Sequence, residues 1–95
     1  MTSDVKMSGQ NSRVKREPTL AFVIPCYNEE VALHVTAGAL KTKIRQLEDS
    51  HAIAKDSIVI FVDDGSSDET WNVIEGLHRD DSVVFHGFKL AHSPQ

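Results

Sequence analysis

The run IVIFVDDGSSDET at residues 58–70 constrains the fold of this chain more than any other feature. Its first five residues are apolar and mostly β-branched, a segment too short for a helix, which indicates a buried strand over residues 58–62. Asp63 and Asp64 follow this strand directly, and the glycine after them allows a tight turn. A Ser-x-x-Glu capping box that begins at Ser66 predicts the start of a helix. The run therefore predicts a strand-turn-helix unit with two carboxylates at the carboxyl end of the strand.

A similar strand-to-helix junction comes earlier in the chain. Residues 20–24 (LAFVI) form a continuous apolar run that predicts a strand covered on both faces. Pro25 is expected to end the pairing of this strand, because proline has no N–H to donate. Asn28 is the expected N-cap of a helix that runs to about residue 48. The apolar side chains of this helix recur at spacings of four and three, as on one helical face: Leu33, Ala37, Leu40, Ile44 and Leu47.

The rest of the chain adds a second helix and a third strand. The second helix is expected to end at Asp80 and Asp81, and its apolar face comprises Val73, Ile74 and Leu77. Residues 83–85 predict the third strand, with an extension to residue 88. The order β-α-β-α-β predicts an α/β fold whose right-handed crossovers make the sheet parallel. Open α/β sheets hold ligands at the carboxyl ends of their strands, so we expect both polar clusters to border one crevice.

Composition and charge limit the classes of function. The chain has 95 residues, one domain at most, in which residues 1–17 predict a disordered polar leader and residues 18–95 the folded part. The net charge of −4 argues against a nucleic-acid partner, whose binding surface needs clustered Lys and Arg. Cys26 is the only cysteine, so neither an internal disulfide nor a cysteine zinc site can form, and a reduced, cytoplasmic setting fits. No apolar run approaches the roughly 20 residues of a membrane-spanning helix.

The polar residues at the two strand ends allow several interpretations. Successive side chains of a strand point to opposite sides, so one of Asp63 and Asp64 should face the crevice while the other braces the loop. A carboxylate there could accept hydrogen bonds from a base N–H or from ribose hydroxyls, or hold a metal ion through water. Alternatively, both aspartates only cap the turn. Tyr27 could stack on a nucleobase or be an ordinary half-buried aromatic. Glu29 could reach a base or sugar, or only place favourable charge at a helix start.

Several other kinds of site do not fit the sequence. The five histidines show no ligand spacing and are expected at the surface, and Cys26 has no placed base to make it a nucleophile. Receiver domains carry paired acidic residues after the first strand, whereas this pair follows the second. HAD-type phosphatases need Asp-x-Asp, but Gly65 stands two positions after Asp63. The dinucleotide and P-loop glycine patterns are missing.

Residues 23–30 (VIPCYNEE) and residues 62–70 (VDDGSSDET) together resemble the start of a family 2 glycosyltransferase with the GT-A fold. The resemblance implies a partial Rossmann-like sheet of the nucleotide-diphospho-sugar transferase type. It also implies that the base and ribose of a nucleotide-sugar contact Pro25, Tyr27, Glu29 and Asp64, with Asp63 next to them. Asp64 is the preferred contact of the base.

Residues 71–74 (WNVI) are closest to the branch of this family that moves sugars onto polyprenyl or dolichyl phosphate. The resemblance implies a divalent cation, Mg²⁺ or Mn²⁺, and frequent membrane attachment in full-length relatives. The family's Asp-x-Asp motif, which carries the cation, is absent, and residues 90–95 lack the family's Ser-Arg-Asn-x-Gly segment. We therefore expect an N-terminal part of the donor-binding domain, inactive alone and without catalytic residues of its own. The alternative is a non-catalytic remnant of a truncated gene, which binds nucleotide or self-associates through an open sheet edge.

Overall fold

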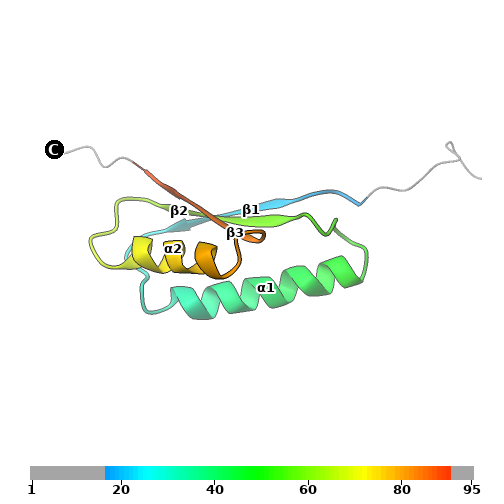
Figure 1. The fold of residues 1–95 in the computed structure, drawn as a ribbon, viewed down its shortest axis with the longest axis horizontal. Helices are drawn as coiled ribbons and strands as arrows, with labels where there is room; N and C mark the ends of the chain where they lie inside the picture. Colours follow the sequence, from blue (N-terminus) through cyan, green and yellow to red (C-terminus); the bar gives the residue numbers. More distant parts are fainter. Residues whose placement is uncertain (1–16, 91–95) are drawn as a thin grey trace, which may run out of the picture.

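The computed structural model describes residues 17–90 of the 95-residue chain. Strands and helices alternate along it: β1 (Ala21–Cys26), α1 (Leu33–Asp49), β2 (Ile58–Asp63), α2 (Thr70–Asp80) and β3 (Phe85–Lys89). The three strands are parallel and lie in the order β1-β2-β3 (Figure 1). These elements confirm the predicted α/β class and the β-α-β-α-β order. The predicted leader lies outside the described residues except for Glu17.

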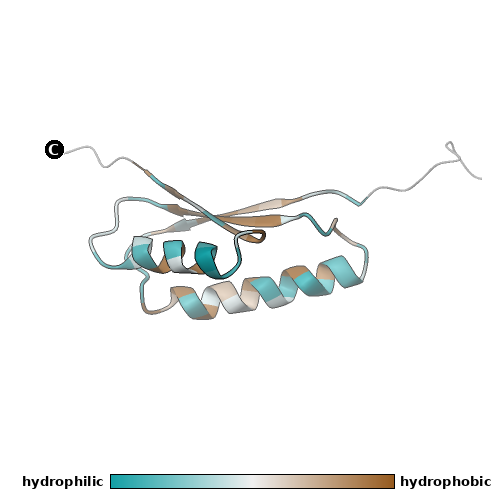
Figure 2. Cartoon of the chain, in the orientation of Figure 1, coloured by the Kyte–Doolittle hydropathy of each residue, from teal (hydrophilic) through white to brown (hydrophobic). Residues whose placement is uncertain are grey.

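Both helices lie on the same face of the sheet (Figure 1). The strand order steps in one direction, so two crossovers of the same hand bring both helices to one side. The prediction that the first strand is covered on both faces is therefore wrong for residues 17–90. On the other face, which we call the bare face, Val23 is 58% exposed and Phe88 is 63% exposed. In Figure 2, brown segments, which mark apolar residues, recur along the strands of the sheet.

The core lies between the sheet and the two helices. Alternate residues of the central strand β2 face the helices, and Val59 and Phe61 are completely buried there. The ring of Phe61 lies 5.8 Å from that of Phe85 on β3, measured between centroids. The apolar stripe predicted for the first helix is confirmed, with three members buried and two partly buried: Leu33, Ala37 and Ile44, then Leu40 and Leu47.

Both helices begin later than the capping patterns predict. α1 starts at Leu33 and follows Ala32 rather than Asn28, which has a positive φ of 50°. Glu29 therefore lies in the loop before α1 and not in its first turn. α2 starts at Thr70, and the predicted capping box at Ser66 does not form. The polar side chains of both loops instead bond across to the opposite loop, as described below.

Pro25 lies inside β1, opposite Val62, and does not end the pairing as predicted. The carbonyls of Leu20 and Cys26 accept hydrogen bonds of 2.9 Å from the N–H groups of Ile58 and Asp64. Backbone groups alternate in direction along a strand, so the nitrogen of Pro25 points away from β2. A proline whose nitrogen faces away from the neighbouring strand removes no hydrogen bond between the strands. This explains why Pro25 can lie inside β1.

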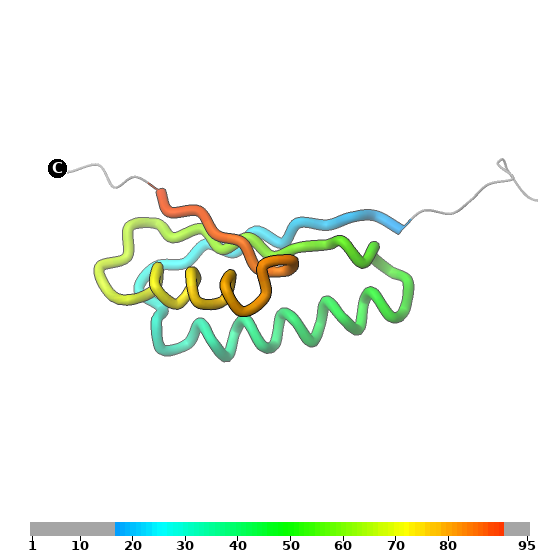
Figure 3. Tube along the Cα trace, in the orientation of Figure 1, coloured from blue at the N-terminus to red at the C-terminus, as the bar shows by residue number. Residues whose placement is uncertain are grey.

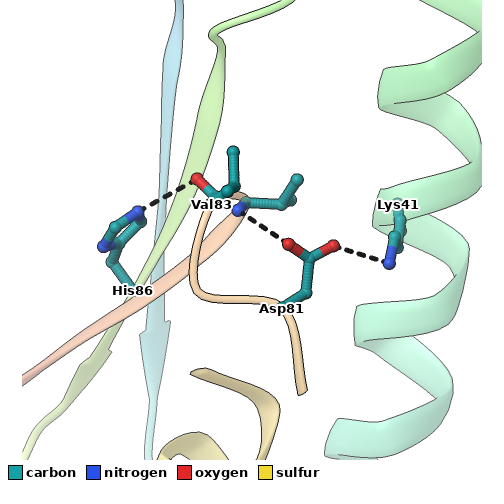
Figure 4. A network of polar contacts seen from close by, with 5 residues as sticks. Lys41, Asp81, Val83 and His86 are labelled. Carbon is teal, nitrogen blue, oxygen red and sulfur yellow. Dashed lines mark hydrogen bonds and ion pairs between the residues drawn. The ribbon is translucent and has the colours of Figure 1, made fainter. Parts of the chain in front are cut away.

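The third strand begins at Phe85, two residues later than predicted. Asp81 organises the turn before it: Oδ1 accepts a 3.2 Å hydrogen bond from the N–H of Val84, and Oδ2 lies 2.6 Å from Lys41 Nζ on α1 (Figure 4). The Asp81 carbonyl also accepts the N–H of Phe85 at 3.0 Å. Val83 is consequently in a turn, with its side chain 70% exposed.

Candidate functional site

Two loops meet at the carboxyl end of the sheet, one after β1 (the first loop, residues 27–32) and one after β2 (the second loop, residues 64–69). Both turns lie at the same end of the molecule in Figure 3, one cyan and the other yellow-green. Cys26 and Asp63 are register partners, and the N–H of Asp64 donates a 2.9 Å hydrogen bond to the carbonyl of Cys26. Tyr27 and Asp64, which follow these partners, therefore leave neighbouring strands at one edge.

The two aspartates have different environments. Asp63 is 1% exposed and faces the helices, as its register partner Cys26 does. Its Oδ1 accepts a 3.1 Å hydrogen bond from the N–H of Ser66, whereas its Oδ2 is buried without a hydrogen-bond partner. Asp64 is exposed. Asp63 thus braces the second loop, and Asp64 presents a carboxylate to solvent.

The remaining predicted residues lie in β1 and in the first loop. Tyr27 is 58% exposed, Pro25 is exposed, and Glu29 is partly buried. The N–H of Tyr27 approaches Glu29 Oε2 at 3.5 Å, a long hydrogen bond. Pro25 and Val62 are register partners on the bare face, the side opposite to Asp63. An exposed tyrosine and an exposed aspartate therefore follow the ends of two neighbouring strands at the same edge of the sheet.

Sequence reasoning missed a set of hydrogen bonds between the loops, which we call the loop clasp. Its first part centres on Asn28, whose N–H donates to Ser66 Oγ and whose Oδ1 accepts from the N–H of Ser67, both at 2.8 Å. The second part joins the N–H of Glu29 to Thr70 Oγ1 at 2.8 Å.

The third part of the loop clasp exchanges bonds between acidic residues and backbone. The N–H of Glu30 donates to Asp68 Oδ2 at 3.3 Å, and Glu30 Oε1 accepts from the N–H of Glu69 at 3.2 Å. Asp68 Oδ1 also accepts the N–H and hydroxyl of Thr70, and these bonds, the hydroxyl bond first, hold the pKa of Asp68 below its usual value. The signal for the clasp was present as paired polar residues in both loops, but local capping rules assigned them to their own helices.

Cys26 lies beneath the site as a neutral thiol. Burial raises its pKa to about 11, with smaller contributions from the carboxylates of Glu29 and Asp63. Its Sγ donates weakly to the carbonyl of Ile24 at 3.5 Å. A thiol in this state is a packing group and not a nucleophile at neutral pH.

The described residues do not fit a divalent cation. Among residues 17–90, no group of three or more His, Cys, Asp or Glu side chains could hold a metal ion. His78 and His86 lie 5.4 Å apart, between ring centroids, and one ring nitrogen of each contacts a carbonyl: His78 Nδ1 that of Phe85 and His86 Nε2 that of Val83. The described residues therefore offer no assembled set of cation ligands.

Two further observations concern the surface. A groove of about 580 Å³ lies along β2, β3 and α2, and none of the five predicted site residues lines it. In the part of the chain that the structure describes, neither helix has the length and hydropathy needed to cross a membrane.

Comparison with known proteins gives a matching family and a similar protein. The sequence model of a family described as "Glycosyl transferase family 2" matches residues 21–95. The Bacillus subtilis (strain 168) protein named "Uncharacterized glycosyltransferase YkoT" is 43% identical over 77 residues, which cover 79% of this chain and 22% of that relative. The chain thus spans less than a quarter of the length of the relative it matches. No solved structure matches the chain.

Proposed function

The chain belongs to glycosyl transferase family 2, and from this premise we propose that it forms the nucleotide-binding part of an enzyme that transfers a sugar from a nucleotide-sugar donor. One observation carries the proposal. The hydrogen bond from the N–H of Asp64 to the carbonyl of Cys26 holds two strand ends together, so that exposed Tyr27 and exposed Asp64 lie at one edge. A flat ring and a charged hydrogen-bond acceptor at one edge of a sheet match the chemistry of a nucleobase.

Each predicted residue has a physical role in this proposal. The ring of Tyr27 stacks on the base, which is worth about 1–3 kcal/mol. The carboxylate of Asp64 accepts hydrogen bonds from a base N–H or ribose hydroxyl, each about 1.5–3 kcal/mol because the acceptor is charged. Pro25 forms the apolar side of the base site. Glu29 lies in the first loop, as Tyr27 does, and contacts the sugar. Asp63 acts indirectly, since its bond to Ser66 shapes the second loop.

The reaction forms a bond between an acceptor oxygen and the anomeric carbon while the nucleoside diphosphate leaves with the electron pair of the broken carbon–oxygen bond. We propose a polyprenyl or dolichyl phosphate as the acceptor, on the resemblance carried by residues 71–74. A phosphate is already an anion, so its attack needs no strong base. We assign no catalytic group and no cation ligand to the described residues, and we expect the 95-residue chain alone to be inactive.

Nucleotide binding can be tested by thermal shift with UDP and GDP as probes. We expect one of them to raise the Tm of the wild-type chain, and Asp64→Asn to abolish that rise because the amide carries no charge. Asp49→Asn removes the same charge from an exposed position at the end of α1 and should leave the rise unchanged. An equal rise in Asp64→Asn and wild type would remove Asp64 from the site. Transfer of sugar from a nucleotide-sugar with Mg²⁺ or Mn²⁺ would contradict the expected inactivity.

The bare sheet face favours a second candidate function, a non-catalytic remnant that associates with itself. Val23 and Phe88 expose apolar surface there, and such surface promotes association. Sedimentation velocity over a range of concentrations tests this candidate. Dimers that form without nucleotide would favour it, and a monomer at every concentration would reject it.

A further inference from the structure

We infer that Asn28 is a positioning residue of the proposed nucleotide site, where it sets the direction in which Tyr27 leaves β1. This inference rests on the proposed function and adds a role for a residue outside the five predicted contacts. Asn28 lies between two of those contacts, Tyr27 and Glu29. Its own side chain points across to the second loop, where Oδ1 accepts the N–H of Ser67.

Asn28 holds the second loop with both its backbone and its side chain. Its N–H donates to Ser66 Oγ at 2.8 Å, and its Oδ1 lies 2.8 Å from the nitrogen and 3.4 Å from the hydroxyl of Ser67. These partners are 38 and 39 residues away in the sequence. A single residue thereby locks the peptide unit after Tyr27 to the loop that begins at Asp64.

The backbone of Asn28 has an unusual conformation. Its φ of 50° lies in the left-handed region, which asparagine tolerates better than most residues. A left-handed residue turns the chain sharply, so the direction of Tyr27 relative to Asp64 depends on this turn being held. The bond from Ser67 holds it, because a change of φ at Asn28 swings the side chain relative to its own N–H, so Oδ1 would leave Ser67 while the N–H stayed on Ser66.

A purely structural role fits Asn28 less well. Asn28 is exposed and contributes little to the core. The loops are joined independently by the bond from Glu29 to Thr70 and by the bond from Glu30 to Asp68. The specific contribution of Asn28 is therefore the geometry of its own turn, next to Tyr27, rather than the connection between the loops.

The variant Asn28→Gly separates these roles, because glycine adopts a positive φ freely and keeps the backbone N–H but removes Oδ1. His51→Gly is the matched control. His51 also has a positive φ, 64°, and its side chain also makes a polar contact, 3.3 Å from Glu17, but it follows α1 at the other end of the molecule. Asn28→Asp keeps an acceptor oxygen for Ser67, and about 1 M salt screens its added charge.

Affinity is measured on the 95-residue chain by titration with UDP and GDP, together with amide exchange of Ser67. We expect Asn28→Gly to weaken binding about tenfold, because a loop that is no longer preorganised must be ordered on binding. Its Ser67 amide should lose protection, while Asn28→Asp and His51→Gly should bind as the wild type does.

Each other outcome has a definite meaning. If the wild type binds and Asn28→Gly binds equally well, the inference is wrong and the proposed function stands. If His51→Gly or Asn28→Asp weakens binding as much as Asn28→Gly, general stability or the altered side chain explains the loss, and the inference is again wrong. If the wild type binds neither probe, the proposed function fails, and the inference fails with it.

Discussion

Glu29 and Thr70 are 41 residues apart in the sequence, yet the N–H of Glu29 donates a 2.8 Å hydrogen bond to Thr70 Oγ1. Thr70 is completely buried, and its hydroxyl donates in turn to Asp68 Oδ1. Thr70, the first residue of α2, therefore also accepts a hydrogen bond from the loop after β1. This bond ties the first loop to the start of α2.

Thr70→Val should lower the free energy of unfolding by about 1–3 kcal/mol, because the shape is kept while the N–H of Glu29 loses its partner. Urea denaturation followed by circular dichroism measures the change. Thr70→Ser keeps the hydroxyl and is the control, with an expected loss of about 1 kcal/mol from the missing methyl group. A valine variant as stable as the wild type would show that the bond does not stabilise the fold.

The contact between Lys41 and Asp81 should make stability depend on pH. The hydrogen bond from Lys41, followed by that from the N–H of Val84, holds the pKa of Asp81 below 3.8 in the folded state. A lowered pKa means that this stabilisation is present above about pH 4 and is lost as the pH falls through the folded pKa. Asp81→Asn should therefore cost about 1 kcal/mol at pH 7 and progressively less in acid.

The control for this measurement is Asp80→Asn, at an exposed neighbouring position at the end of α2. Its unfolding curve should follow that of the wild type across the pH range. A difference between wild type and Asp81→Asn that stays constant down to about pH 2 would contradict the assigned ion pair.

Gly87→Ala should destabilise the sheet. A Cβ at this position would overlap Ile74 Cγ2 and lie 3.3 Å from Trp71 Cζ3, so β3 and α2 would have to separate. Overpacking of this kind costs about 1–3 kcal/mol. Gly38→Ala is a control of opposite sign, because nothing lies within 4 Å of its Cβ and alanine favours a helix by about 1 kcal/mol. Differential scanning calorimetry measures the Tm of both variants. Shifts of the two Tm values in the same direction would contradict the prediction.

Cys26 should react slowly in the folded chain. Burial raises its pKa from 9.0 to about 11, so at pH 8 the folded state holds about 100-fold less thiolate than the unfolded state. Alkylation by iodoacetamide, followed by mass spectrometry, should therefore accelerate in urea in parallel with unfolding. The raised pKa also predicts that stability declines between pH 9.0 and about 11. Rapid native labelling at pH 8 would contradict the burial of this thiol.

The apolar patterns predicted the elements because periodicity is a local property. The stripe from Leu33 to Leu47 and the run at residues 58–62 report which side of each element is buried. How many faces of a strand are covered depends on where the helices pack, which is not a local property. The apolar run before Pro25 resembles a fully buried strand, although Val23 faces away from both helices.

The helix starts were wrong for a physical reason. Asn28 and Ser66 are good capping residues, but a side chain that bonds elsewhere cannot also cap its own helix. Here the side-chain oxygen of each residue accepts a hydrogen bond from the backbone of the other's loop. Asn28 and Ser66 are 38 residues apart, whereas the capping-box pattern compares only residues within four positions of each other.

The sequence indicated that Asp63 and Asp64 point to opposite sides, because side chains alternate along a strand. Which of the two is buried depends on where α1 and α2 pack. The structure buries Asp63 and exposes Asp64. Their roles toward a ligand remain part of the proposed function.

The position of Pro25 affects how the outer edge of β1 can pair with a further strand. An extended polypeptide that added itself beside β1 would find no donor at Pro25, since the nitrogen on that margin carries no hydrogen. On β3, the outward backbone groups of Gly87 and Lys89 have no such block. Within residues 17–90, a strand pairing beside β3 would therefore meet the N–H groups of Gly87 and Lys89, whereas one pairing beside β1 would lack a donor at Pro25.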